Sequence, residues 1–551
     1  MSGYNADLKV FSVKSDLMDP IYEEFNKKWK QISKIVLGEE VGELADFEKW
    51  LIGTSRTALE RKSSISGKPV RFVMPHYSDS AKFASLDEID LLRKFEPLDI
   101  NELKDLDSIV EAVKERIIYT GSVHLGESKF LSESTDIVSS SYIYKSAQVA
   151  YSKWIAYGYN MENCEYLFGC QNTGFGSSFS IKCMGADTQI RCLENYSTSK
   201  CQDCYFSNSL IGAKNCLFSF GLRNAAYCVG NLQLSLEEYA KIKKKLLEDV
   251  VDDLKRKKTL PELEDFFLSS EPNLTKGRAI LSKPKELEKP DKEIIEDAFR
   301  RTTKIVFGRE VSGLDKYGSW LKQHTRDLKI CKSVLSDTRI IVPDYSKLYY
   351  YPENRLVTED EILLVGKNLT IDKEKLAGFS LKTAGEIVND VAFFCGTENC
   401  GVLKNNIDSE INISCQNFYK SILNVQCRFG AFNFHGLESE YLFGTYTLRR
   451  SSFCIRCYLS ENLIRCFEVD SSRSCADAYF CHNCENVREG MFCFNAKNLN
   501  YAIGNVELPK EEYLRIKRKV LDGVVNTLEK TGSYGVNVFN LMDKLKEFEK
   551  R

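Results

Sequence analysis

Cysteines are the residues of this chain whose type and spacing most suggest chemistry, and the 551-residue sequence contains 20 of them. Three pairs have the Cys-x-x-Cys spacing that is typical of zinc ligands: Cys201 with Cys204, Cys454 with Cys457, and Cys481 with Cys484. Four cysteines follow one another at steps of twelve residues: Cys192, Cys204, Cys216 and Cys228. Zinc binding, disulfide bonding, nucleophilic catalysis and a structural role are the alternatives that these patterns raise.

Carboxylates are the second set of candidate chemical groups. The column of residues just before the cysteines reads Arg191, Asp203, Asn215 and Tyr227, and it recurs later as Arg465, Asp477, Glu489 and Tyr501. Glycan-cleaving enzymes use two carboxylates about 5 to 10 Å apart, so an acidic outer face is one hypothesis. Its candidate catalytic residues are Glu194, Asp203, Glu468 and Asp477. We favour the alternative that each arginine of the column forms an ion pair with the aspartate twelve residues later.

The chain resembles itself, which helps to decide among these alternatives. KIVLGEEVGEL from Lys34 matches KIVFGREVSGL from Lys304, EYLFG occurs from Glu165 and from Glu440, and EEY occurs from Glu237 and from Glu511. The matching segments are 270 to 275 residues apart, which predicts a tandem duplication. No Cys-x-x-Cys pair and no histidine occupies the same place in both copies. We therefore expect no metal, no cofactor and no cysteine nucleophile with a histidine base.

Each copy must contain elements that position these residues. A mixed helix-and-strand head comes first, a cysteine-bearing region with few helix formers follows, and a helix ends the copy. In the cysteine-bearing region every third residue is small or compact. This pattern predicts a parallel β-solenoid with about twelve residues per coil, or 24 if each coil has two similar sides, and with cysteines as small buried residues. The predicted fold class is α+β: a tandem duplication in which each copy is an α/β head, a parallel β-solenoid and a C-terminal capping helix.

The sequence also predicts where these parts begin and end. They are an N-terminal segment 1–30, a first head 31–120, a first solenoid 121–232, its capping helix 233–258, a linker 259–300, a second head 301–390, a second solenoid 391–506, its capping helix 507–530 and a tail 531–551. We expect each capping helix to cover the open end of the last coil, where unpaired backbone groups would otherwise recruit another chain.

Large aromatic residues adjoin the cysteine series and are expected on the outside of the solenoids. They are Tyr205, Phe206, Phe218, Tyr479, Phe480 and Phe492. Exposed aromatic columns usually mark interfaces. We therefore expect a non-enzymatic structural or scaffold protein that self-assembles, most simply into a homo-oligomer. The alternative is a glycan-binding or glycan-cleaving protein that uses the acidic outer face.

Composition argues against several other functions. Lys and Arg number 76 against 78 for Asp and Glu, so no excess positive charge attracts nucleic acid. Apolar runs are far shorter than the roughly 20 residues of a membrane span, and the first residues do not form a secretory signal. We expect no nucleic-acid or membrane partner and a cytoplasmic location in which the thiols stay reduced, with a virion or other assembled particle as a further setting.

The end of the first predicted solenoid, FSFGLRNAAYCVGNLQLSLEEY from Phe218, resembles that of a group of uncharacterised cysteine-rich repeat proteins from candidate-phyla bacteria. Those proteins contain Asn-Cys steps and finish with Leu-Arg-Asn, Tyr-Cys and Glu-Glu-Tyr motifs. The resemblance covers the two predicted solenoids and implies a repetitive, solenoid-like fold without implying an activity. Members often begin with a zinc ribbon, whereas the first 163 residues here contain no cysteine.

Overall fold

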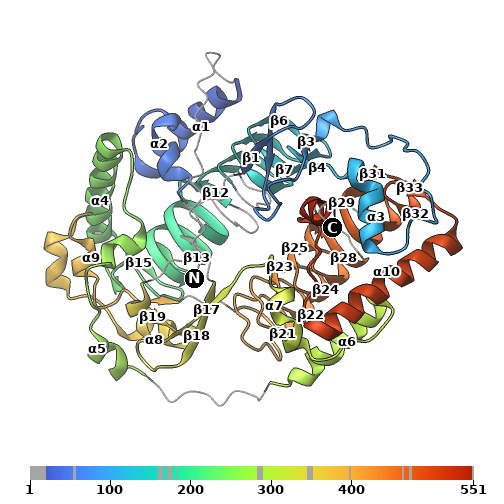
Figure 1. Ribbon diagram of the computed structural model, residues 1–551. Coiled ribbons are helices and arrows are strands. Elements are labelled where there is room, and N and C mark those ends of the chain that lie inside the picture. Colours follow the sequence, from blue (N-terminus) through green and yellow to red (C-terminus); the bar gives the residue numbers. More distant parts are fainter. Residues whose placement is uncertain are drawn as a thin grey trace.

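The computed structural model has a mixed α+β architecture in which most strands are short and parallel. It describes residues 20–53, 58–158, 165–169, 177–182, 184–281, 290–343, 352–395, 399–461, 464–470 and 475–548. Residues 20–281 are called the first half below, and residues 290–548 the second half. Figure 1 shows that the two halves close into a ring, with one stack of strands on each side.

Helices flank the strands in both halves. The four long ones are α1 (Pro20–Leu37), α4 (Leu236–Lys257), α6 (Lys292–Phe307) and α10 (Lys510–Thr531). The shorter ones are α2 (Leu44–Leu51), α3 (Leu106–Val113), α5 (Leu274–Ala279), α7 (Gly318–Leu321), α8 (Glu359–Asn368), α9 (Ala384–Ile387) and α11 (Leu541–Phe548). None of the helices within the described residues is long and apolar enough to cross a membrane.

Each half has a small head of two strand pairs. The first head contains the antiparallel pair β1 (Leu59–Lys62) and β2 (Pro69–Phe72), the parallel pair β3 (Phe83–Ser85) and β4 (Tyr119–Gly121), and α3. The second head contains the antiparallel pair β17 (Leu328–Lys332) and β18 (Arg339–Pro343), the parallel pair β19 (Leu356–Val357) and β20 (Phe394–Cys395), and α8 and α9.

A stack of strands follows each head. The first stack contains β5 (His124–Leu125), β6 (Lys129–Ser132), β7 (Thr135–Val138), β8 (Ser141–Tyr144), β9 (Ala147–Ala150), β10 (Lys153–Ala156), β11 (Glu165–Phe168), β12 (Ser177–Ser180), β13 (Met184–Ile211), β14 (Lys214–Leu217), β15 (Ala226–Val229) and β16 (Leu232–Gln233). The second stack contains β21 (Gln416–Tyr419), β22 (Arg428–Ala431), β23 (Phe434–Leu437), β24 (Glu440–Phe443), β25 (Tyr446–Arg449), β26 (Ser452–Ile455), β27 (Tyr458–Glu461), β28 (Ile464–Asp470), β29 (Ala476–Glu485), β30 (Arg488–Met491), β31 (Phe494–Lys497), β32 (Asn500–Ile503) and β33 (Val506–Glu507).

The register of the parallel strands explains the spacing of the cysteines. Cys204 pairs with Cys216, and Cys216 pairs with Cys228, so residues twelve positions apart lie side by side. Through much of both stacks, every third residue has a left-handed backbone conformation, as Asp203 does with a φ of 51°. The residue that follows each left-handed position points inward, and Cys204 is fully buried. The three-residue step of the left-handed positions and the twelve-residue step of the strand pairs together bring these cysteines into the interior.

Interior serines and cysteines stabilise the turns in the same way. Ser207 Oγ donates to the carbonyl oxygen of Tyr205 at 3.0 Å, and Cys204 Sγ donates to that of Gln202 at 3.4 Å. Ser207 Oγ also accepts the backbone N–H of Ser219 at 3.1 Å, which ties adjacent strands together. Buried backbone groups need such partners. A short side chain with a hydrogen-bond donor therefore suits the interior, whether that donor is a hydroxyl or a thiol.

The long C-terminal helices of the two halves lie along the flanks of the stacks. Tyr239 near the start of α4 contacts Tyr227 at a ring-centroid distance of 5.7 Å, and Lys243 lies over the Tyr205 ring, nearer the middle of the stack. In the second half α10 makes the same two kinds of contact. These helices form at the predicted places. Their apolar faces pack against the last parallel strand of each stack and against α1 or α6, so they do not cover the open ends alone.

The open end of each stack is covered by the other half of the chain. Gly230, which follows β15, lies against Val388 and Ile371, and its carbonyl oxygen accepts the Ile371 N–H at 3.2 Å. Gly504, which follows β32, lies against Val113 of the first head. Figure 1 shows α3 beside β32 and β33. The two halves thus hold each other at two places, which close the ring.

Candidate functional site

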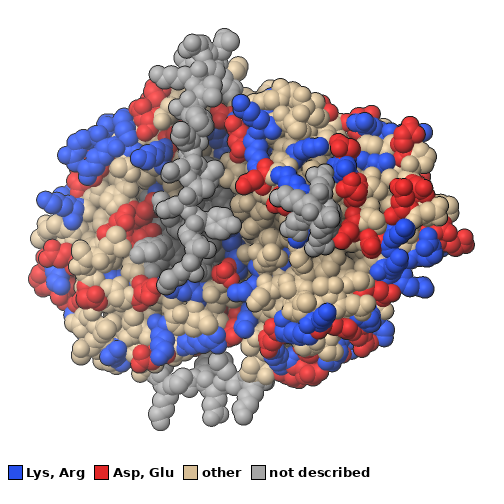
Figure 2. All heavy atoms as spheres, viewed as in Figure 1, with Lys and Arg blue, Asp and Glu red and all other residues tan. Residues whose placement is uncertain are grey.

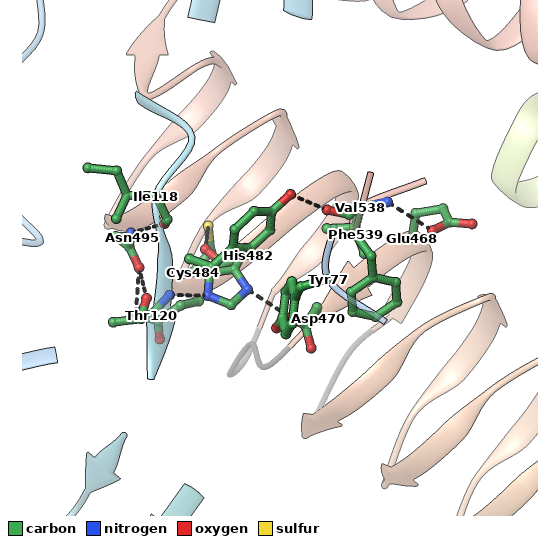
Figure 3. Close-up of polar contacts among 12 residues, drawn as sticks. Tyr77, Ile118, Thr120, Glu468, Asp470, His482, Cys484, Asn495, Val538 and Phe539 are labelled. Carbon is green, nitrogen blue, oxygen red and sulfur yellow. Dashed lines mark hydrogen bonds and ion pairs between the residues drawn. The ribbon is translucent and has the colours of Figure 1, made fainter. Parts of the chain in front are cut away.

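Polar side chains from both halves meet where the first head rests on the second stack (Figure 3). We call this cluster the polar seam. It contains Tyr77, Tyr119 and Thr120 from the first head, Asp470, His482 and Asn495 from the second stack, and Val538 and Phe539 from the C-terminal segment. Each of these residues has an exposed fraction of 7% or less.

The strand register positions the central pair of the polar seam. Asp470 is the last residue of β28 and is paired with His482 of β29, twelve residues later. The same step that aligns the cysteines therefore places a carboxylate beside an imidazole. Strand β4 of the first head then brings Thr120 to the other side of the imidazole ring.

Hydrogen bonds fix the tautomer of His482. Its Nδ1 lies 2.9 Å from Asp470 Oδ2, and its Nε2 accepts the backbone N–H of Thr120 at 2.7 Å. Because a backbone N–H only donates, the imidazole hydrogen must be on Nδ1, from which it is donated to Asp470. Both ring nitrogens are therefore occupied within the chain. A general base needs a nitrogen lone pair that reaches the substrate, and His482 offers none in this arrangement.

The remaining groups of the polar seam complete a network without an open position. The Tyr77 hydroxyl donates to the same oxygen of Asp470, and the Tyr119 hydroxyl donates to the Val538 carbonyl oxygen at 2.5 Å. Burial raises the pKa of both tyrosines well above the usual range, and the Asp470 charge adds to this effect. Both phenols therefore stay protonated and act as donors. Asn495 donates to the Ile118 carbonyl oxygen at 2.7 Å, so it ties the second stack to β4.

A buried ion pair lies beside this network. Arg456 and Glu468 pair with each other and are both fully buried. Glu468 also accepts the Val538 N–H at 3.2 Å, and Arg456 donates to the carbonyl oxygen of Trp320. Partners on both charges offset the cost of removing them from water. The pair links the second stack to the C-terminal segment and leaves no carboxylate oxygen for a substrate to approach from outside.

Two histidines adjoin this ion pair, one from each half. The rings of His76 and His324 have centroids 4.7 Å apart, and both face Phe539. Neither ring nitrogen of His324 has a hydrogen-bond partner among the described residues. Burial lowers the pKa of His324 to about 2, with the Arg456 charge and His76 contributing in the same direction. His324 therefore stays neutral while the ring is closed.

The acids that the sequence suggested as catalytic residues do not form an acidic outer face among the described residues. Glu468 is buried in the ion pair just described, and Asp477 pairs with Arg465 at 2.9 Å. Asp203 lies 3.8 Å from Lys243 of α4. Each is thus matched with a cation, and the expected pairing of Arg465 with Asp477 is present. The side chains of Glu194 and Arg191 lie outside the described part of the chain.

The candidate zinc ligands that the structure describes are buried thiols. Cys204, Cys481 and Cys484 are buried, while the side chain of Cys201 lies outside the described residues. Cys481 donates to the carbonyl oxygen of Tyr479 at 3.3 Å, and Cys484 donates to that of Cys493 at 3.2 Å. Burial raises the pKa of both donating thiols, so neither is a ready thiolate ligand or nucleophile. No cluster of three or more metal-binding side chains occurs in the part of the chain that the structure describes.

The expectation that six aromatic residues form exposed interface columns is wrong. Tyr205, Phe206, Phe218, Tyr479, Phe480 and Phe492 each have an exposed fraction of 1% or less. Phe206 and Phe218 do stack as neighbours in a column, but Phe266 covers both. The Tyr205 hydroxyl donates to the Val36 carbonyl oxygen of α1 at 3.0 Å. Flanking segments of the same chain therefore bury these columns.

Sequence reasoning did not single out the residues of the polar seam. The twelve-residue step from Asp470 to His482 was readable in the sequence, because it equals the cysteine step. The contacts from Tyr77 and Thr120 were not, since they depend on how the first head meets the second stack. Comparison with known proteins finds no match for this chain among family models, curated proteins or solved structures.

Proposed function

We propose that this chain is a non-enzymatic structural or scaffold protein: a ring made by tandem duplication of a head and a β-solenoid with a twelve-residue coil. The observation that carries the proposal is the reciprocal covering of the stack ends. Val113 covers Gly504, and Val388 covers Gly230. The two valines are separated by 270 to 275 residues, as the matching sequence segments are, and so are the two glycines. An arrangement in which equal surfaces cover each other is that of a two-fold dimer joined into one chain.

Repeated contacts inside the halves support the duplication. The Tyr205 hydroxyl donates to the Val36 carbonyl oxygen at 3.0 Å, and the Tyr479 hydroxyl donates to that of Val306 at the same distance. Strand pairs at steps of twelve support the short coil in both stacks. Two copies of one sequence that kept the same packing would produce these repetitions.

The state of the chemical groups supports a role without catalysis. His482 has both nitrogens in hydrogen bonds within the chain, and the interior thiols donate to backbone carbonyl groups. The glycan-active alternative needs two accessible carboxylates, whereas Glu468 is fully buried. The face drawn in Figure 2 carries residues of both charges, and the whole chain has no excess of positive charge, which supports the expectation of no nucleic-acid partner. A reducing, cytoplasmic setting belongs to the proposal, because it keeps the buried thiols as hydrogen-bond donors.

Self-assembly into a homo-oligomer stays a prediction, and the six buried aromatic residues no longer support it. Light scattering on the purified chain tests the predicted assembly, and a panel of polysaccharides tests the absence of catalysis. We expect a discrete species of at least twice the 63.0 kDa mass of the chain and no hydrolysis of any glycan, whereas a monomer would contradict the predicted homo-oligomer. Glycan cleavage that Asp477→Asn abolishes without a change in stability would contradict the proposal and favour the acidic-face alternative.

A further inference from the structure

The ring has two seams at equivalent places, and their chemistry differs. At the polar seam the first head meets the second stack through the hydrogen bonds described above. At the other seam, which we call the apolar seam, the second head meets the first stack mainly through rings, and Lys373 of the second head pairs with Glu238 of α4 at 2.8 Å. Phe220, Phe267 and Phe394 contact one another there with centroid distances of 5.5 to 5.9 Å. The backbone bond from Ile371 to Gly230 closes the same seam.

Histidines are concentrated at the polar seam. The chain has five: His482 belongs to the polar seam, and His76 and His324 adjoin it through Phe539. His76 and Thr120 belong to the first half, whereas His324 and His482 belong to the second half. Histidine is the side chain whose charge ordinarily changes between pH 5 and 8. Three of the five imidazoles of the chain are thus placed across one seam of the ring.

We propose that the polar seam is an acid-sensitive latch, which releases the first head from the second stack when its histidines are protonated, while the apolar seam stays closed. The proposal goes beyond the structural role proposed above, because it assigns that structure a switch between a closed and an opened ring.

Protonation of His482 removes one bond across the seam. A second proton must go to Nε2, which would then present an N–H to the N–H of Thr120. The groups that face this ring are Asp470 and Phe494 within the second stack and Tyr77 and Tyr119 from the first head. Asp470 would hold the charged imidazole within its own half. The bond that is lost is therefore the one between the halves.

His324 adds a free-energy term of the same sign. It faces Arg456, His76, Tyr458 and Phe539, and the nearby Glu468 is already paired with Arg456. In the closed ring the pKa of His324 is lowered to about 2, whereas an imidazole in water has a pKa of about 6.5. The closed state thus binds fewer protons than an opened one. Its stability is complete above the ordinary histidine pKa and falls as the pH drops below it.

One carboxyl group beside the polar seam, that of Asp136, opposes this effect. Burial, with the Asp470 charge adding to it, raises the pKa of Asp136 in β7 to about 7. Mild acid therefore neutralises Asp136 and relieves its repulsion with Asp470. Acid opens the ring only if the loss of closing free energy from the histidines exceeds the gain from Asp136. The hydrogen-exchange experiment measures the net effect of both.

Hydrogen exchange of the full-length chain, read at the Thr120 and Ile371 amides by mass spectrometry, tests the latch. The Thr120 amide bonds across the polar seam, and the Ile371 amide bonds across the apolar seam. After correction for intrinsic exchange rates, we expect the protection of Thr120 to fall about tenfold or more between pH 8 and pH 5, while that of Ile371 changes less than about twofold. No loss at Thr120, or an equal loss at both amides, would overturn the proposal.

Two variants separate the latch from general acid sensitivity. His324→Phe keeps a ring against Phe539 but cannot take a proton, so it should retain much of the Thr120 protection at pH 5. His435→Phe, in β23 and outside the seam, is the matched control and should lose protection as the unaltered chain does. If His324→Phe fails to fold, His482→Asn replaces it, because Asn208 occupies the equivalent place at the apolar seam. The same loss in the seam variant and in the control would contradict the proposal.

Discussion

Gly504, at the end of the second stack, lies directly against Val113 of the first head, and a Cβ atom at Gly504 would overlap the valine side chain. Gly230 at the end of the first stack has the same relation to Ile371 and Val388. Both glycines have a φ of 53°, in the left-handed region. Because these glycines have no side chain, each half can approach the end of the other half's stack closely enough to cover it.

The first prediction concerns this close approach. Gly504→Ala should lower the free energy of unfolding by about 2 to 4 kcal/mol, because overpacking adds to the cost of a left-handed alanine. Gly308→Ala is the matched control, since Gly308 also has a left-handed φ, 79°, but a Cβ atom added there would meet no other atom within 4 Å. The control should cost only about 1 kcal/mol in urea denaturation. Equal costs for the two substitutions would show that Val113 does not press against Gly504.

The second prediction concerns the size of the interior. Cys216→Ala should cost about 1 to 2 kcal/mol of unfolding free energy, because removal of the sulfur atom leaves only a small cavity. Cys216→Leu should cost more, because overpacking typically costs about 1 to 3 kcal/mol and here would also displace Cys204 and Cys228 in the adjacent strands. Urea denaturation of the two variants checks the order. A leucine variant as stable as the alanine variant would contradict an inward-facing position.

The third prediction compares two ion pairs that have the same twelve-residue spacing. Asp477 pairs with the half-exposed Arg465, so Asp477→Asn should cost no more than about 1 kcal/mol. Glu468 and Arg456 are both fully buried, so Glu468→Gln should cost about 3 to 5 kcal/mol by leaving a buried charge without its partner. Thermal denaturation at pH 7 measures both. Equal losses of stability in the two variants would contradict the difference in burial between the two ion pairs.

The fourth prediction concerns the pH dependence of Asp136. The pKa of this carboxyl is raised to about 7 in the folded chain, whereas an unfolded aspartate has a pKa of about 4. The folded state therefore loses stability as the pH rises from about 4 through 7. Asp136→Asn should gain stability over the unaltered chain at pH 8 and gain little at pH 4, as calorimetry at the two pH values would show. An equal difference at both values would contradict the assignment.

Periodicity in the sequence was sufficient to predict local features of the stacks. The twelve-residue cysteine step corresponds to the pairing of Cys204 with Cys216, and the helix expected over 233–258 forms as α4. Such features depend on residues near one another in the sequence, so their pattern carries the information. The interior role of cysteine follows from the same pattern, because a short side chain after a left-handed residue points inward and its thiol can donate to a backbone carbonyl group.

Features that depend on distant contacts were not predictable in this way. The pattern shows that Phe206 and Phe218 leave the coil at the same side, but it does not show that Phe266 covers them. Nor does it show that Thr120 reaches His482, because the two residues lie in different halves. What covers a column, and which half closes a stack, depends on the packing of whole elements.

The most direct test of the account is native-state alkylation of the cysteines, mapped by peptide mass spectrometry. The central claim is that the cysteines of the stacks are buried structural thiols. Cys400 is exposed, whereas Cys204, Cys216, Cys481 and Cys484 are buried. We expect Cys400 to react rapidly with a water-soluble alkylating reagent and the four buried cysteines to react only after unfolding, because burial blocks access and raises a thiol pKa. Labelling of the buried four at the rate of Cys400 in the folded chain would contradict the account.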